Sequence, residues 1–200
     1  MGHKLFKAEQ VADLQSALTE LWHRSRGSTV PSDNELEELV AAQHGANFDL
    51  WHEEDASRDP LADDRAIARG KRKIDGLNQE RNDLVERIDA VLLENFPEMN
   101  PAACLNSETP AMIVDRLSIL ALKVYHTQQE AQRGTAGEEH QRRNRQRLEI
   151  LLAQRADLTG CLRDLMAEVE AGTRRFKLYR QMKMYNDPEL NPSIYGRRSG

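Results

Sequence analysis

The chain has 200 residues, a net charge of −5 and 30% charged residues, and only 5% of its residues are aromatic. A chain of this length can bury a core without disulfides or metals, and its two cysteines are too few for a disulfide framework, so we expect a cytoplasmic protein. The longest apolar run, 119–122, is far too short to insert into a membrane, and the scarcity of Val, Ile and aromatic residues disfavours a sheet-rich fold.

The first half of the chain predicts three helices. The first runs from about Lys7 to Arg26, where apolar residues recur every three or four positions. Ser32 and Glu35 form a capping-box pattern for the second helix, which continues to about Arg58 before an Asp-Pro pair breaks it. The third spans about 64–95 and is followed by a long loop that is rich in proline.

The second half predicts two long helices and a short one. The fourth helix opens at Thr109 and is apolar almost all round, which is typical of a central, buried helix. The fifth, 138–171, carries a heptad seam with one polar member, Arg155, and such a seam packs either within a bundle or across a dimer. A basic, aromatic stretch, 173–192, predicts a last short helix that ends at 186–188.

Together these elements predict an all-α, mostly antiparallel bundle of five to six helices with no sheet. We expect one domain over 1–200, with 1–6 and 193–200 as loose ends, and a homodimer. The stretch 140–183 is basic, but it lacks the interleaved aromatic residues or known motif that nucleic-acid binding needs, so no nucleic acid is expected as a partner.

Polar residues interrupt the inward faces of three of these helices. On a helical wheel, Arg81 lies inside the apolar arc of the third helix, and Lys71, Asp75, Asn78 and Asn82 follow one border. The inward face of the second helix starts with Leu36 and Val40 and then turns polar, as His44, Asn47, Trp51, Glu54, Asp55 and Arg58. His52 and Glu53 point elsewhere on this wheel. The fourth helix adds Asp115, Arg116, Lys123 and His126.

These polar groups must pair if they are buried, because an unpaired buried charge costs several kcal/mol. Natural partners are Arg81 with Asp115 and Arg116 with Asp75. One interpretation is an ion-pair and amide network that fixes the register of the bundle. The other is that the same groups line a pocket for a polar or phosphorylated ligand. The sequence leaves both open.

Familiar catalytic motifs are scarce. Glu20 and His23 form one Glu-x-x-His pair, whereas di-iron bundles need two such pairs and two more carboxylates. There is no H-E-x-x-H motif, no cysteine pair with zinc spacing and no glycine-rich phosphate loop.

Four stretches, in order along the chain, resemble a bacterial helical family known as domain of unknown function 4254: 46–58, 71–83, 107–126 and 177–192. The resemblance implies no assigned activity. It does imply that relatives tend to be encoded near glycosyltransferases of lipopolysaccharide assembly. Carried over by position, its motifs overlap the off-pattern polar residues and add Arg72, Asp83 and Lys183.

The first hypothesis is therefore a binding or accessory protein of envelope-glycan synthesis with an internal polar pocket for an anionic small molecule. Its ligand-binding candidates are Trp51, Arg58, Lys71, Arg72, Asp75, Asn78, Arg81, Asn82, Asp115, Arg116 and Lys183. The second is a Mg²⁺-dependent hydrolase or transferase acting on a nucleotide or sugar phosphate. Its catalytic and metal candidates are Glu54 or Asp55 as base, His126 or His52 as acid, and Asp75 with Asp83 as Mg²⁺ ligands. The third is a dimeric scaffold without a ligand.

Overall fold

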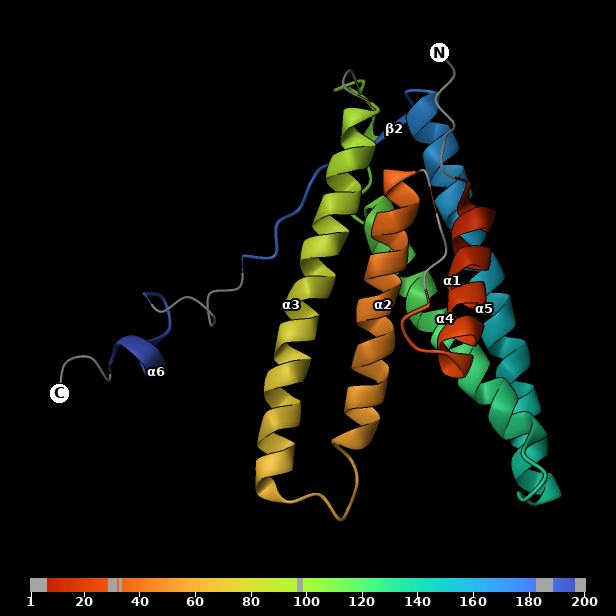
Figure 1. Cartoon of the computed structure of the whole chain (residues 1–200). Coiled ribbons are helices and arrows are strands. Elements are labelled where there is room, and N and C mark those ends of the chain that lie inside the picture. Colours follow the sequence, from red (N-terminus) through yellow and green to blue (C-terminus); the bar gives the residue numbers. More distant parts are fainter. Residues whose placement is uncertain (1–6, 29–31, 33, 97–98, 183–188, 197–200) are drawn as a thin grey trace.

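The computed structural model describes residues 7–28, 32, 34–96, 99–182 and 189–196. Its elements are α1 (Ala8–Arg24), α2 (Glu35–Ala56), α3 (Asp64–Glu94), β1 (Cys104–Leu105), α4 (Pro110–Gln132), α5 (Glu138–Glu170), β2 (Arg174–Arg175) and α6 (Pro192–Tyr195). The predicted all-α fold is confirmed: five long helices form two hairpins, α2–α3 and α4–α5, with α1 packed alongside (Figure 1).

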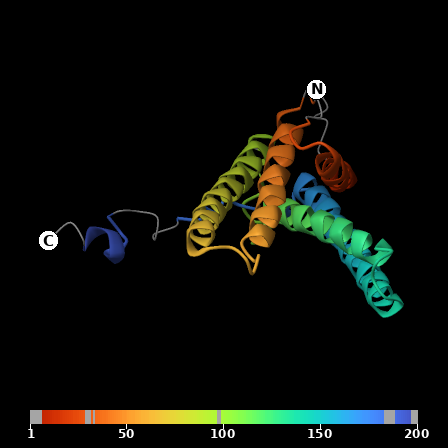
Figure 2. The ribbon, with the colours of Figure 1, turned by 60° about the horizontal axis from the view of Figure 1, so that its bottom comes forward.

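Helix α4 is the centre of the bundle and contacts α1, α2, α3 and α5. Val114 and Leu117 on α4 have no exposed surface, which confirms the prediction of a central, buried helix. A turned view shows the far end of the α4–α5 hairpin extending away from the other helices (Figure 2). None of the described helices is both long and apolar enough to cross a membrane.

Side chains cap four of the described helices, α2, α3, α4 and α6. Thr109 caps α4 by accepting a hydrogen bond from the amide of Met112, as its position before Pro110 predicts. The capping box predicted at Ser32 is wrong by two residues. Asn34 is the N-cap of α2, because its side chain accepts from the Leu36 amide at 3.0 Å.

The heptad seam of α5 packs within the bundle over its second half. Leu158, Leu162 and Val169 are buried there. Its polar member, Arg155, reaches α1, where Nη2 donates to the carbonyl oxygen of Ala12 at 2.6 Å and to the Ser16 hydroxyl at 2.7 Å. Arg155 is therefore a specific contact that sets where α1 docks on α5.

Two expectations for the C-terminal stretch are wrong. The helix predicted from 173 to 186–188 does not form in its described part, 173–182. The expected absence of any sheet is wrong at one point. Arg174 and Arg175 instead form β2, which pairs in parallel with β1. The reason is tertiary: Gly172 ends α5 with a positive φ of 70°, and Phe176, 1% exposed, anchors the extended chain in the core.

Buried Asp89 gives a prediction for this framework. Its carboxylate accepts from the amide of Ala111 at the start of α4, at 3.0 Å. Burial raises its pKa to about 6, against the opposing effect of hydrogen bonds from the Thr109 side chain and the Ala111 amide. The folded state therefore binds the Asp89 proton more tightly than the unfolded state does. Asp89 stabilises the folded state at low pH, and this contribution is lost as the pH rises from about 4 through about 6.

Asp89→Asn keeps an acceptor oxygen but carries no charge. We expect the variant to gain roughly 2–3 kcal/mol of unfolding free energy relative to the wild type when the pH is raised from about 4 to about 7. Urea denaturation of both proteins at each pH measures the difference. A constant difference between the two proteins across this range would contradict the prediction.

Candidate functional site

Buried polar side chains connect α1, α2 and α4 through the core. Thr19 Oγ1 donates to the Gln15 carbonyl oxygen at 2.8 Å, so the Thr19 hydroxyl must accept the next bond, from His44 Nε2 at 2.9 Å. His44 Nδ1 then accepts from the Ser118 hydroxyl at 2.8 Å. Burial, followed by the positive charge of Arg26, lowers the pKa of His44 to about 3, so the ring is neutral.

The same network includes the carboxylate of Asp115 on α4. Its Oδ1 accepts from Gln43 Nε2 at 2.5 Å and from Asn47 Nδ2 at 2.9 Å, and Asn47 also donates to Ser118 at 3.0 Å. Arg81 Nε on α3 lies 3.7 Å from the same carboxylate oxygen. The predicted pairing of Arg81 with Asp115 is confirmed.

A pocket opens beside this network, between α2, α3 and α4. Its volume is about 340 Å³, and its lining residues are Asn47, Leu50, Trp51, Glu54, Asp55, Arg58, Asn78, Arg81, Ile119 and Leu122. The apolar lining side chains come from α2 and α4, and the lining also includes two arginines and two carboxylates. Arg58 Nη1 pairs with Glu54 at 2.8 Å, while Asn78 Nδ2 donates to the carbonyl oxygen of Ile74.

Two lining residues keep a buried N–H group without a hydrogen-bond acceptor among the described residues. These groups are Trp51 Nε1 and Arg81 Nε. Both residues line the pocket, and buried donors are almost always paired in folded proteins, so these two groups are exceptions.

The structure brings together part of the predicted site. The predicted residues that line the pocket are Trp51, Glu54, Asp55, Arg58, Asn78 and Arg81. Asp115 does not line it but accepts a hydrogen bond from Asn47, which does. Lys71 and Asp75 instead form an exposed ion pair with each other, so the predicted pairing of Asp75 with Arg116 is wrong. Arg116 pairs with Glu108 at 2.5 Å and lines a different cavity.

The remaining candidates do not join the pocket. Arg72 is exposed, Asn82 does not line the pocket, and Lys183 lies outside the described residues. Asp75 and Asp83 are eight residues apart on one helix, roughly 12 Å along its axis, so the two carboxylates are not placed to share one Mg²⁺. Asp83 accepts from Gln79 Nε2 at 2.7 Å.

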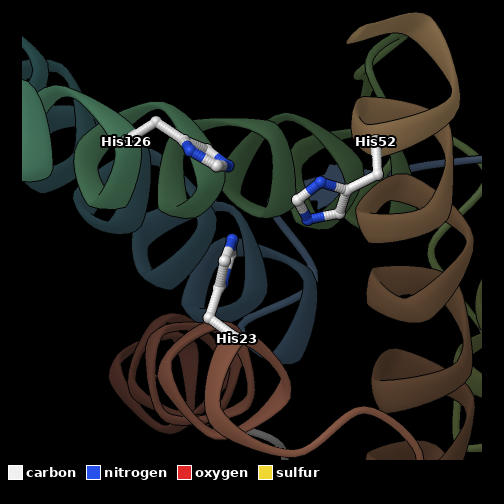
Figure 3. Close-up of side chains that lie close together, drawn as sticks. All are labelled: His23, His52 and His126. Carbon is white, nitrogen blue, oxygen red and sulfur yellow. The ribbon is translucent and has the colours of Figure 1, made fainter. Parts of the chain in front are cut away.

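A second cluster, which we call the histidine cluster, lies next to Trp51. It consists of His23 from α1, His52 from α2 and His126 from α4, whose side chains point toward one another (Figure 3). One ring nitrogen from each lies within 4.8 Å of the others, and no other such group of three or more His, Cys, Asp or Glu occurs in the described ranges. His126 stacks on Trp51, with ring centroids 4.7 Å apart.

Burial and the neighbouring rings favour the neutral form of His52 and of His126. Burial, then the neighbouring charges of His23 and His52, lowers the pKa of His126 to about 4. Burial, followed by His23, also lowers the pKa of His52, while Asp55 acts in the opposite direction on both rings. At neutral pH, His126 therefore offers a lone pair and lacks the second ring proton of an imidazolium, which is the proton that a histidine acting as general acid usually gives.

Sequence reasoning misses several residues of this region. Gln15, Thr19, Gln43 and Ser118 are fully or almost fully buried polar residues that the helical wheels do not single out. The sequence singles out His23 only as half of a Glu-x-x-His pair. The available signal was that Thr19 and His23 recur at a spacing of four along the predicted first helix and so share one face.

The fold and the pocket define an all-α helical protein with a small polar pocket. Residues 37–178 match the model of the family described as protein of unknown function DUF4254. The chain belongs to this family, as the resemblance of its motifs indicated. No curated protein and no solved structure matches the chain. The match begins within α2, so His23 precedes it, while His52, His126 and the pocket residues lie inside it.

Proposed function

We propose that this protein is a binding or accessory protein whose pocket holds an anionic small molecule, of the class of sugar phosphates and nucleotide sugars. The observation that carries the proposal is a pair of N–H groups on two pocket-lining residues. Trp51 Nε1 is buried without a hydrogen-bond acceptor among the described residues, and Arg81 Nε is buried with only the Asp115 carboxylate near it, at 3.7 Å. The volume of about 340 Å³ suits a small ligand.

The mixed charge of the pocket supports a sugar phosphate over a simple anion. Arg58 and Arg81 supply donors suited to phosphate oxygens, and Arg binds phosphate through paired N–H groups. Glu54 and Asp55 supply acceptors for several carbon-bound hydroxyl groups, which a sugar carries and inorganic phosphate lacks. The apolar side chains of Leu50, Ile119 and Leu122, with the Trp51 ring, offer a surface for the carbon face of a sugar or base.

The proposal also covers the cellular role of the protein and its oligomeric state. We propose a bacterial, cytoplasmic protein of envelope-glycan (lipopolysaccharide) synthesis, which rests on the gene neighbourhood that the family resemblance implies. We also propose a homodimer, because Ile150 and Leu152 on the first half of α5 are 59% and 45% exposed. Light scattering of the purified chain would test the homodimer, and a monomeric mass would contradict it.

A second candidate is a hydrolase or transferase that uses the pocket carboxylates. The presence of Glu54 and Asp55 among the lining residues supports this candidate, in which one of the two carboxylates acts as the base. Turnover of a bound nucleotide sugar, lost in Glu54→Gln or Asp55→Asn while binding persists, would make the protein an enzyme.

The test is a thermal-denaturation panel with uridine diphosphate glucose, glucose 1-phosphate, inorganic phosphate and glucose, each with and without Mg²⁺. We expect the phosphorylated sugars to raise the melting temperature more than phosphate or glucose does. A ligand at 100 times its Kd stabilises by about 2.7 kcal/mol. The shift should largely disappear in Arg81→Gln, measured against the ligand-free melting temperature of that variant.

The matched control is Arg142→Gln, which removes an exposed arginine of α5 that pairs with Glu139 and does not line the pocket. This variant should keep the full ligand shift. If no compound in the panel moves the melting temperature of the wild type, the proposal fails and the polar network serves as a ligand-free scaffold. An equal shift in Arg81→Gln would place the ligand elsewhere.

A further inference from the structure

We propose that His23, His52 and His126 form a binding site for one divalent transition-metal ion of the kind that prefers nitrogen ligands, with Zn²⁺ as the representative. This inference goes beyond the proposed function, because it needs no ligand in the polar pocket. Each histidine comes from a different helix, and the three nitrogen atoms already lie within 4.8 Å of one another (Figure 3).

His23 is oriented as metal-binding histidines usually are. Its Nδ1 lies 2.7 Å from the carbonyl oxygen of Thr19, and because a carbonyl only accepts, Nδ1 carries the proton. The lone pair is then on Nε2, which is buried and has no hydrogen-bond partner among the described residues. A ligating histidine characteristically donates its other ring N–H to a carbonyl or carboxylate, which fixes the tautomer and the ring.

His126 has the same unusual feature. Its Nε2 is also buried and also lacks a partner in the described part of the chain. Two buried, unpartnered nitrogen atoms in rings whose centroids are 4.9 Å apart would each carry a desolvation cost. A cation between them would satisfy both nitrogen atoms at once.

The surroundings hold the rings in place. Tyr125 stacks on His23 with centroids 4.0 Å apart, and Trp51 stacks on His126. Phe48 lies edge-on to both His23 and His52, at 4.8 and 4.6 Å. His52 is the exposed member, so the cluster opens to solvent on its side and an ion can enter there.

The donor set determines which metal is expected. Three imidazole nitrogens suit Zn²⁺, Cu²⁺, Ni²⁺ or Fe²⁺, whereas Mg²⁺ and Ca²⁺ prefer oxygen ligands. In a tetrahedral zinc site with bonds of about 2.0–2.1 Å, ligand nitrogens are about 3.3 Å apart, so the rings would close by roughly 1.5 Å on binding. Three protein ligands leave a fourth position open for water or another molecule.

The competing explanation is an aromatic cluster in which the three rings only pack against Phe48 and Tyr125. The two explanations differ in what an added ion does. A true site takes up one ion per chain and ties α1 to α2 and α4, which raises the melting temperature because the ion binds only the folded state. A packing cluster takes up no ion, and its melting temperature does not change when the ion is added.

The experiment uses the full chain without an added polyhistidine tag, after dialysis against a chelator. Zn²⁺ is titrated by calorimetry, and melting is measured with Zn²⁺ and, separately, with Mg²⁺. We expect one Zn²⁺ per chain, a higher melting temperature that a chelator reverses, and no effect of Mg²⁺. Co²⁺ should give the visible absorption of a tetrahedral site with nitrogen ligands.

The key variant is His52→Ala, because His52 is exposed and its loss leaves the core intact. It should weaken Zn²⁺ binding at least tenfold, and His126→Ala should do the same. His140→Ala is the matched control, because His140 pairs with Glu130 at 2.7 Å on the α4–α5 hairpin and should leave binding unchanged. Absence of Zn²⁺ binding to the wild type, or full binding by His52→Ala, would overturn the proposal.

Discussion

Replacing Asp115 with alanine is expected to lower the free energy of unfolding by about 2–4 kcal/mol. The carboxylate accepts hydrogen bonds from Gln43 and Asn47 and lies beside the guanidinium of Arg81. Gln43 has no exposed surface, so its amide would be left buried without an acceptor. The side chains of Arg81 and Asp115 are 27% and 17% exposed, so solvent screens part of the lost ion pair and the estimate stays below that for a fully buried one.

Asp75→Ala is the control for this change, because it removes the same side chain from an exposed ion pair with Lys71. Surface pairs contribute about 0–1 kcal/mol, so this variant should unfold nearly as the wild type does. Asp115→Asn keeps an acceptor oxygen and should fall between the two. Urea denaturation at neutral pH compares all four proteins. Equal stability of the two alanine variants would mean that the Asp115 network does not hold the bundle together.

Acid should destabilise the protein through His44. The pKa of this residue is about 3 in the folded state, against an ordinary value of 6.5. The unfolded state therefore binds the proton first, and the folded state loses stability as the pH falls from about 6.5 toward about 3. Between pH 7 and pH 5 the loss from this one group amounts to about 2 kcal/mol, and over the whole window it approaches about 5 kcal/mol.

His44→Gln removes the titrating ring, so its stability should fall less steeply between pH 7 and pH 5 than that of the wild type. His126 also lowers the stability of both proteins as the pH falls, so its contribution cancels when the wild type and the variant are compared. NMR gives an independent measurement: the ring signals of His44 should not titrate above pH 5 while the protein is folded. Titration near pH 6.5, or parallel stability curves, would contradict a neutral, buried His44.

The pocket could be predicted from the sequence because its residues follow helical periodicity. Trp51, Asp55 and Arg58 follow the face that begins with Leu36 and Val40, so a wheel places them inward. Arg81 interrupts an apolar arc, and burial energetics then require a partner, which Asp115 supplies.

The histidine cluster could not be predicted from the sequence in the same way. His52 falls off the inward face of α2, and it becomes part of a cluster only because α1 packs against that side of the helix. Which side α1 covers depends on contacts such as Arg155 with the Ala12 carbonyl, which join residues 143 positions apart. Periodicity within one helix contains no information about such a contact. The extended segment after Gly172 was missed for the same reason, because Phe176 is held by the core and not by local pattern.

The most direct measurement of the central claim uses the fluorescence of Trp51. The chain has two tryptophans, so a Trp22→Phe variant leaves Trp51 in the pocket wall as the only tryptophan. Titration of this variant with uridine diphosphate glucose or glucose 1-phosphate is predicted to give a saturable change in emission. The change should be absent when Arg81→Gln is added and retained when Arg142→Gln is added. Emission that stays constant, or that changes equally in the Arg81→Gln background, would show that the pocket between α2, α3 and α4 is not the binding site.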